Sequence, residues 1–347
     1  MSKIYTILKK NELADCQVEI LAELSEKGLI SYKEKALKRL QEVAEIPGFR
    51  KGKVPEAKLR EKFGALGLLE EAAQLAIEDV AIEAIAETKV NFIGRPDIAI
   101  TKIAEGSPVE FKILLSVLPD IKLPNYTKIA KSVVEEKAEA VTEKQIDETV
   151  EEIRRLYAQE HHTHAPGEVH RDDEELPLPE VNDAFVKGFG DFENVAAFRA
   201  KLAENIAKEK EMRAKDKRRL TILEGIAKEA NFSLPALIIE NELDKMQAQF
   251  TGDIANMGLQ PEEYLKHIKK TWNELRGEWR ADAEKRAKTQ LLLQKIALEE
   301  KIEPRKEEVE KQVKFLLEQY KQADESRTRA YVEQMLTNEA VLAFLEK

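Results

Sequence analysis

The sequence contains few of the residues that build disulfides, tight turns or aromatic cores. Its 347 residues include one cysteine, 14 glycines, 12 prolines and 6% aromatic residues. A single cysteine excludes an intrachain disulfide framework and a cysteine-rich zinc or iron–sulfur site. The low numbers of glycine and proline disfavour an all-β sandwich or barrel, which needs turn residues every few positions, and favour long helices.

Long apolar stretches are also missing. No stretch approaches the roughly 20 apolar residues that span a bilayer, and Met1–Lys10 has no apolar core of a signal peptide. Charged residues make up 35% of the chain, which indicates a soluble, globular and unusually ionic protein. We therefore expect a cytoplasmic protein with two or three domains and no membrane partner.

Negative charge dominates the chain, but one segment is basic. The formal net charge of −10 argues against nonspecific binding of nucleic acid by the whole surface. Between Lys33 and Lys62, however, ten basic residues accompany five acidic ones. A polyanionic partner is therefore expected to bind in this segment.

The first third of the chain alternates between two kinds of periodicity. Alternating apolar and polar residues predict four strands, at Ile4–Lys9, Gln17–Leu24, Ile98–Ile103 and Val109–Val117. Helical spacing between the second and third strands predicts three helices, at Leu29–Val43, from Pro55, and from about Ala65 to Glu87. This order predicts an α+β domain over residues 1–118.

The rest of the chain shows almost only helical periodicity. Pro119 and Pro124 predict an extended linker over residues 119–135, since each proline disfavours the helical region for its predecessor. Thr142–Gln145 is a capping box, and we predict a mainly α-helical body with extended arms over residues 136–347, with a polar loop at 159–180. Further helices are expected at Leu237–Phe250, Trp272–Ile302, Val309–Tyr320 and Tyr331–Leu345. The last two helices should form an antiparallel hairpin that turns near Ala323–Ser326, in an elongated multidomain protein.

A helix that begins near Asn194 has an unusual middle. Its residues Lys208–Arg219 are nearly all charged. A helix that is polar all round does not pack into a core there, so this stretch is expected to project into solvent or to bridge subdomains.

The most informative segment is Ile46–Pro55, which we call the tip. Its two glycines and two prolines predict an exposed loop between two helices. Its cations, Arg50, Lys51 and Lys53, cannot be buried without partners. Phe49 has no apolar neighbours in the pattern, which suits stacking on a partner or insertion into it. An ordinary solvated loop, with Phe49 folded back onto the domain, is the alternative on the residues alone.

The tip resembles a family signature. Gly48, Phe49, Arg50, Lys51, Gly52, Lys53, Val54 and Pro55 match every fixed position of the GFRxGKxP signature of trigger factors, bacterial chaperones that dock at the ribosomal exit tunnel. Leu176–Glu204 is also similar to the start of that family's helical C-terminal domain. The resemblance covers nearly the whole chain.

Several expectations follow from this resemblance. It implies an ATP-independent chaperone that shields nascent or unfolded polypeptides in a helical cradle. The residues that would bind an exit-site ribosomal protein and rRNA are Gly48, Phe49, Arg50, Lys51, Gly52, Lys53 and Pro55. No cofactor and no nucleotide partner are expected, and a homodimer away from the ribosome is allowed.

The chain departs from the family in one respect. Trigger factors usually carry an FKBP-like prolyl isomerase domain between the linker and the helical body. Here only Gln159–Leu178 occupies that place, and it contains no aromatic residue. An isomerase pocket of that type is an apolar cleft lined by aromatic side chains. We therefore expect a short form without prolyl isomerase activity, and not an enzyme.

Apolar residues of the helical body are candidate client contacts, because methionine and amphipathic faces adapt to varied partners. The candidates are Met246, Phe250, Met257, Leu259, Leu316, Tyr320, Met335, Leu336 and Phe344. The alternative for each is that it packs against another helix as core.

Four of the five histidines lie in the polar loop. His161, His162, His164 and His170 stand close to Asp172 and Asp173, and imidazoles with carboxylates are common ligands of Zn²⁺ or Ni²⁺. Their spacing matches no defined site, and ordering a loop costs entropy before it can chelate. We interpret the segment as a hydrophilic linker and expect no metal.

Three other functions compete with a ribosome-bound chaperone. A ribosome-associated or RNA-associated factor with a helical scaffold would share the basic tip but would not suppress aggregation of a denatured protein. A periplasmic chaperone with a similar helical body would need a signal peptide. A plain helical scaffold leaves the basic tip unexplained.

Overall fold

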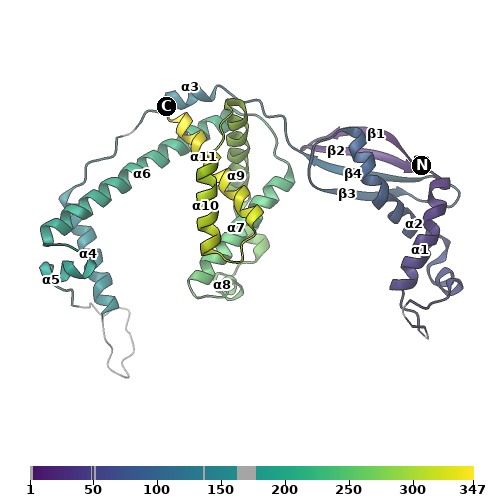
Figure 1. The fold of residues 1–347 in the computed structure, drawn as a ribbon, viewed down its shortest axis with the longest axis horizontal. Coiled ribbons are helices and arrows are strands. Elements are labelled where there is room, and N and C mark those ends of the chain that lie inside the picture. The colour runs from purple at the N-terminus through teal and green to yellow at the C-terminus, as the bar shows by residue number, and fades with distance from the viewer. Residues whose placement is uncertain (1–2, 48, 51, 136, 162–176) are drawn as a thin grey trace. The chain divides into compact units, whose positions relative to one another are not determined.

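The structure is a computed structural model, and it describes residues 3–47, 49–50, 52–135, 137–161 and 177–347 (Figure 1). Within these ranges lie four strands, eleven α-helices and one short 3-10 helix. The chain divides into two compact units, each built from two segments. The first unit is Met1–Leu123 with Ala230–Lys295, and the second is Pro124–Glu229 with Ile296–Lys347.

The first unit contains a four-stranded antiparallel sheet in the order β1-β2-β4-β3. Its strands are β1 (Tyr5–Leu13), β2 (Gln17–Leu24), β3 (Phe92–Lys102) and β4 (Val109–Val117). Every second residue of β2, from Val18 to Leu24, is buried, and its partners on β4 alternate in the same way. This alternation leaves one apolar face for helices to cover, as the sequence predicts. The predicted α+β fold of the N-terminal part is confirmed.

Two helices cover that apolar face. They are α1 (Glu26–Val43) and α2 (Glu56–Thr88), and α2 buries a row of alanines and aliphatic residues against the sheet. Gly64 interrupts α2 with a φ of 70° and a ψ of 178°. The break separates a short helix from a long one, so the prediction of two successive helices in this region is confirmed.

The first unit also contains α7 (Ala236–Asn256), α8 (Pro261–Ile268) and most of α9 (Trp272–Glu300). Ile239, Leu243 and Ala283 are buried together between α7 and α9. At the start of α7, Leu237 lies against Gly94 of β3, where an added Cβ would come within 2.3 Å of the Leu237 side chain. Gly94 also has a φ of 74°, so both space and backbone geometry require glycine there.

The second unit is helical throughout its described residues. Its elements are α3 (Tyr126–Ser132), α4 (Glu143–Glu160), α5 (Asp183–Val186), the 3-10 helix η1 (Lys187–Phe189), α6 (Val195–Glu229), α10 (Lys306–Gln319) and α11 (Glu325–Leu345). Both halves of the Thr142–Gln145 capping box are present at the start of α4. Helices α10 and α11 pack together through Val309, Val313 and Val332, so the predicted hairpin is confirmed. Helix α3, which Asn125 caps, was not predicted.

The charged middle of α6 contacts other parts of its unit. Lys210 Nζ donates to the backbone oxygens of Glu139 and Ala140, at 3.4 and 3.1 Å. Arg219 pairs with Glu339 and Glu346 of the α11 end. Of the two expectations for this stretch, bridging therefore describes this face of α6, and projection into solvent does not. None of the helices in the described ranges is both long and apolar enough to cross a membrane.

Candidate functional site

The tip connects α1 to α2 and is fixed at its base. Ala44, Val54 and Leu59 are buried together there. The Gln41 side chain donates from Nε2 to the Val54 oxygen at 2.8 Å, and the Gly52 amide donates to the Gln41 oxygen at 3.1 Å. Burial and hydrogen bonds thus hold both ends of the loop on the same helical turn of α1.

Above this base the tip presents an aromatic ring and two cations. Phe49 is 41% exposed, so it does not fold back into the core. Arg50 and Lys53 are exposed and pair with no acidic side chain among the described residues. Gly52 has a φ of 80°, a conformation that favours glycine. Of the other predicted tip residues, Pro55 is exposed and precedes α2, while Gly48 and Lys51 lie outside the described residues.

Some of the basic residues on the two flanking helices are ion-paired. The ion pairs are Lys35 with Asp79, Arg39 with Glu71 and Glu78, Lys58 with Glu61, and Arg60 with Glu56. Lys62 donates to the backbone oxygen of Glu45 instead. Lys33 and Lys38 of α1 are exposed and have no acidic partner among the described residues, so the uncompensated positive charge between Lys33 and Lys62 lies on α1 as well as at the tip.

The candidate client residues divide into two groups. Met257, Leu259, Tyr320 and Met335 are exposed, whereas Met246, Phe250, Leu316, Leu336 and Phe344 are half-buried. Met246 packs on the core between α7 and α9, and Leu316 and Leu336 pack within the α10–α11 hairpin. The Phe250 ring meets the rings of Tyr264, Trp272 and Trp279 edge to face. Met246, Phe250, Leu316 and Leu336 thus pack against other parts of the core, and the exposed group remains accessible.

The hairpin also exposes two aromatic residues that the sequence analysis missed. Phe315 is 55% exposed and Tyr331 is 60% exposed. Tyr331 and Met335 are four residues apart and therefore lie on one face of α11. Each of the two aromatic residues lies next to the buried apolar positions of its helix in the helical pattern. An aromatic residue at such a position is the sequence signal that could have identified them.

Helical spacing gives the hairpin two different sides. One side carries the Arg329–Glu310 ion pair together with Lys314 and Glu333. The other, which we call the aromatic side, carries Gln312, Phe315, Leu316, Tyr331, Gln334 and Met335. Lys311 and Arg327, four residues before Phe315 and Tyr331, lie on the same side, so this exposed apolar surface is bordered by amides and by charged side chains.

The described residues hold no group of three or more histidine, cysteine, aspartate or glutamate side chains placed to bind a metal ion. His161 ends α4, and its ring stacks on that of Tyr157 with centroids 3.9 Å apart. His162, His164 and His170 lie outside the described residues. The His161 ring is thus held by packing against Tyr157.

Two family models match the chain. "Bacterial trigger factor protein (TF)" matches residues 6–153, and "Bacterial trigger factor protein (TF) C-terminus" matches residues 194–346. The chain belongs to the trigger factor family. Members of this family are ribosome-associated chaperones that bind the ribosome and nascent polypeptides, and membership implies the same general role here.

Individual trigger factors have low sequence identity to this chain, but the similarity covers most of both chains. The trigger factor of Halothermothrix orenii is 26% identical over 94% of this chain and 93% of its own length. The trigger factor of Agathobacter rectalis is 25% identical over 90% of this chain and 86% of its own length. That of Halalkalibacterium halodurans is 24% identical over 84% of this chain and 85% of its own length. A solved structure concerned with promiscuous substrate recognition by the trigger factor chaperone has a TM-score of 0.53 and 16% identity, over 98% of this chain and 99% of that one. That similarity supports the trigger factor fold.

Proposed function

We propose that this chain docks at the ribosomal exit site through its tip and shields unfolded polypeptides on the exposed apolar surface of its helical body. The observation that carries the docking proposal is the pairing state of the cations. Arg50 and Lys53 are exposed and have no acidic partner in the described part of the chain, whereas Lys35, Arg39, Lys58 and Arg60 of α1 and α2 are ion-paired. Unpaired cations keep their full attraction for rRNA phosphates or for acidic side chains.

The construction of the tip suits a docking element. Its base is fixed by the Gln41 hydrogen bonds and by burial of Val54, so little chain entropy is lost on binding. Phe49 stands beside Arg50, where a ring can stack on a base or enter an apolar notch. Charge then supplies attraction, and the ring supplies short-range contact.

Co-sedimentation with ribosomes tests the docking proposal. The triple variant Phe49→Ala, Arg50→Ala, Lys51→Ala should lose co-sedimentation and keep its circular dichroism spectrum. The matched control is Lys58→Ala with Arg60→Ala, which removes the same number of positive charges from cations that are paired with Glu61 and Glu56. The control should still sediment with ribosomes. Undiminished co-sedimentation of the triple variant would end this proposal.

Client shielding is assigned to the aromatic side of the hairpin and, with it, to the exposed Met257 and Leu259. Many weak apolar contacts allow fast release without a nucleotide, and methionine adapts to varied sequences. Phe315→Ser with Tyr331→Ser should weaken suppression of aggregation of a denatured model protein. Lys314→Ser with Glu333→Ser, on the ion-paired side, should leave suppression unchanged.

A ribosome-associated or RNA-associated factor that binds no clients is the second candidate function. It shares the unpaired cations of the tip, and it predicts that the unmodified protein does not suppress aggregation at all. The same aggregation assay therefore separates the two functions.

We also propose that the chain does not catalyse prolyl isomerisation. The two family models leave residues 154–193 between them, and Gln159–Leu178 contains no aromatic residue to line an apolar cleft. A protease-coupled assay on a proline peptide should give the uncatalysed rate. Turnover that persists through repurification would contradict this.

A further inference from the structure

The C-terminal end of α11 is bound to α6 through one arginine. Arg219 Nε donates to Glu346 Oε1 at 2.7 Å, and its Nη2 and Nη1 donate to the two carboxylate oxygens of Glu339, at 2.6 and 3.1 Å. We call these three residues the Arg219 cluster. The side chains of Arg219 and Glu346 are only 13% and 15% exposed. Hydrogen bonds from Arg219 lower the pKa of the Glu339 carboxyl, which favours its ionised form.

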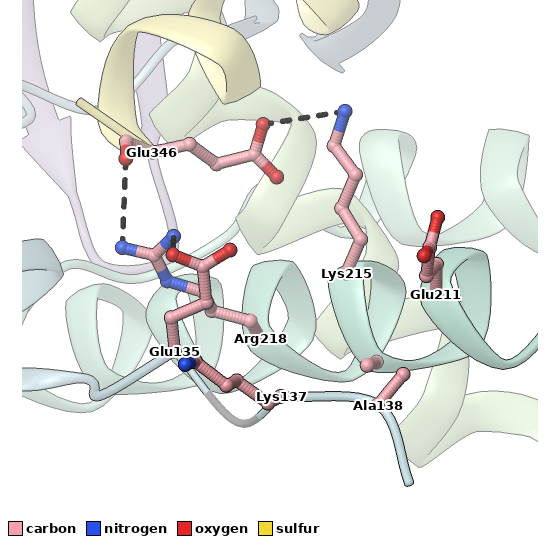
Figure 2. A pocket seen from close by; sticks show the side chains of 8 residues that line it. Glu135, Lys137, Ala138, Glu211, Lys215, Arg218 and Glu346 are labelled. Atoms are coloured by element: carbon pink, nitrogen blue, oxygen red, sulfur yellow. Dashed lines mark hydrogen bonds and ion pairs between the residues drawn. The ribbon is translucent and has the colours of Figure 1, made fainter. Parts of the chain in front are cut away.

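The neighbouring basic residues make weaker contacts around a polar cavity of about 650 Å³ (Figure 2). Lys215 Nζ lies 3.6 Å from Glu346 Oε2. Arg218 Nη2 is 3.5 Å from the Glu346 backbone oxygen, and its Nη1 is 3.8 Å from Glu135. The Nε of Arg218 is buried without a hydrogen-bond partner in the described structure. Adjacent arginines thus differ sharply, because Arg219 is fully engaged and Arg218 is not.

The hairpin has attachments besides the Arg219 cluster. Helix α10 packs mainly on α11, and α11 also contacts α3. Val341 and Leu345 near the C-terminal end of α11 are buried, and a short segment that begins at Lys301 joins α9 to α10. The ion-paired and buried residues that fix the direction of the hairpin therefore lie near the C-terminal end of α11, away from the hairpin turn.

The Arg219 cluster is built to set that direction. Glu339 and Glu346 are seven residues apart, which is about two helical turns or about 10 Å along α11. One planar guanidinium that contacts both carboxylates restrains the rotation and the tilt of the helix together. A lysine ammonium is a compact point charge and cannot reproduce both contacts.

We propose that Arg219 is a positioning residue that fixes the direction of the α10–α11 hairpin and thereby presents its aromatic side to clients. The client half of this statement rests on the proposed function above. The positioning half stands independently, since it concerns the geometry of one unit. Arg219 itself contacts no client in this scheme and acts only through α11.

Distance measurements between spin labels test the positioning half. In a Cys16→Ser background, labels at Glu224→Cys on α6 and Gln322→Cys in the hairpin turn report the hairpin direction by double electron–electron resonance. Arg219→Met should broaden the distance distribution, and Arg219→Lys should restore it only in part. Arg218→Met is the matched control, and its distribution should stay narrow. An unchanged distribution in Arg219→Met would overturn the proposal.

A second measurement connects the hairpin to clients. Arg219→Met should weaken binding of a fluorescent unfolded model protein by about tenfold, which corresponds to about 1.4 kcal/mol, while ribosome co-sedimentation stays intact. Glu339→Gln with Glu346→Gln should give the same loss, and combining them with Arg219→Met should add nothing further. Additive losses would refute coupling through the cluster. If Phe315→Ser with Tyr331→Ser leaves client binding unchanged, the proposed function fails, whereas the label distances still decide the positioning role.

Discussion

Two groups of basic residues in this chain have opposite surroundings. Arg50 and Lys53 of the tip are exposed and meet no acidic side chain in the described residues, whereas Arg219 of α6 is largely covered and contacts two glutamates. In the sequence both belong to short basic runs within an acidic protein. The difference shows that local positive charge alone does not identify a binding surface. What matters is whether the fold supplies partners: a cation with partners supports the scaffold, and one without them is available to another molecule.

Salt should separate the two groups most strongly. If the three tip cations each neutralise a phosphate, raising the salt concentration from about 50 mM to about 200 mM should weaken ribosome binding by about 20- to 40-fold. Counterion release causes this loss, and it acts on exposed contacts. Pelleting with ribosomes at the two salt concentrations measures it.

Over the same salt range, the urea midpoint of unfolding should change little, because the Arg219 and Glu346 side chains are mostly shielded from solvent. Salt-independent ribosome binding would place the docking surface elsewhere than on the cations of the tip.

The free energy of unfolding should depend on Arg219 and hardly at all on Arg50. Arg219→Ala leaves Glu346 covered and without its closest partner, and we expect the second unit to lose about 2 kcal/mol of unfolding free energy. Arg50→Ala removes no partner and should stay within about 0.5 kcal/mol. Urea unfolding of both variants gives the result. Equal losses in the two variants would contradict the distinction drawn here.

Substitution of Gly52 tests whether the backbone conformation of the tip contributes to ribosome binding. At a φ of 80° an alanine would meet no atom within 4 Å, so Gly52→Ala tests backbone strain alone. We expect a cost of about 1 kcal/mol and a matching several-fold decrease in ribosome affinity. Gly67→Ala lies in α2 with ordinary contact distances and serves as a control that should not weaken affinity.

The smallest expected effect is on the pH dependence of stability and comes from the contact between Tyr126 and Glu300. The Tyr126 hydroxyl donates to Glu300 Oε1 in the second unit, and this hydrogen bond, with some burial, raises the pKa of Tyr126 to about 12. A raised folded-state pKa means that the contact stabilises the fold fully below the ordinary pKa of 10.0, and that this stabilisation is lost as pH rises through about 12.

Ultraviolet difference titration against Tyr126→Phe isolates this tyrosine. Glu300→Gln should bring its pKa back toward the ordinary value. A titration that Glu300→Gln leaves unmoved would exclude the hydrogen bond as the cause.

Local patterns predict the elements of this fold well, and long-range partners less well. The strands, the interruption near Ala65 and the α10–α11 hairpin follow from periodicity, glycine and proline within a few residues. The tip follows from its composition in the same way. Helix α3 is short and polar, and its asparagine cap directly follows Pro124, so nothing in the apolar pattern marks it.

The partners of α6 could not be predicted from its sequence, because Glu339 and Glu346 lie more than a hundred residues further along the chain. The same reason explains why the sequence could not separate exposed from half-buried client candidates. Phe250 is covered by Tyr264, Trp272 and Trp279, which other helices contribute. Whether an apolar residue faces solvent depends on these distant segments.

Gln41 has a consequence for engineering. Two hydrogen bonds join Gly52 and Val54 to Gln41, the Lys53 amide donates to the Arg50 oxygen, and Ile46 packs on the buried base, so the side chains of Phe49 and Arg50 are not among the groups that hold the loop. Different side chains at positions 49 and 50 should therefore redirect the molecule to another surface, while the base of the loop, the sheet and its covering helices fold as before.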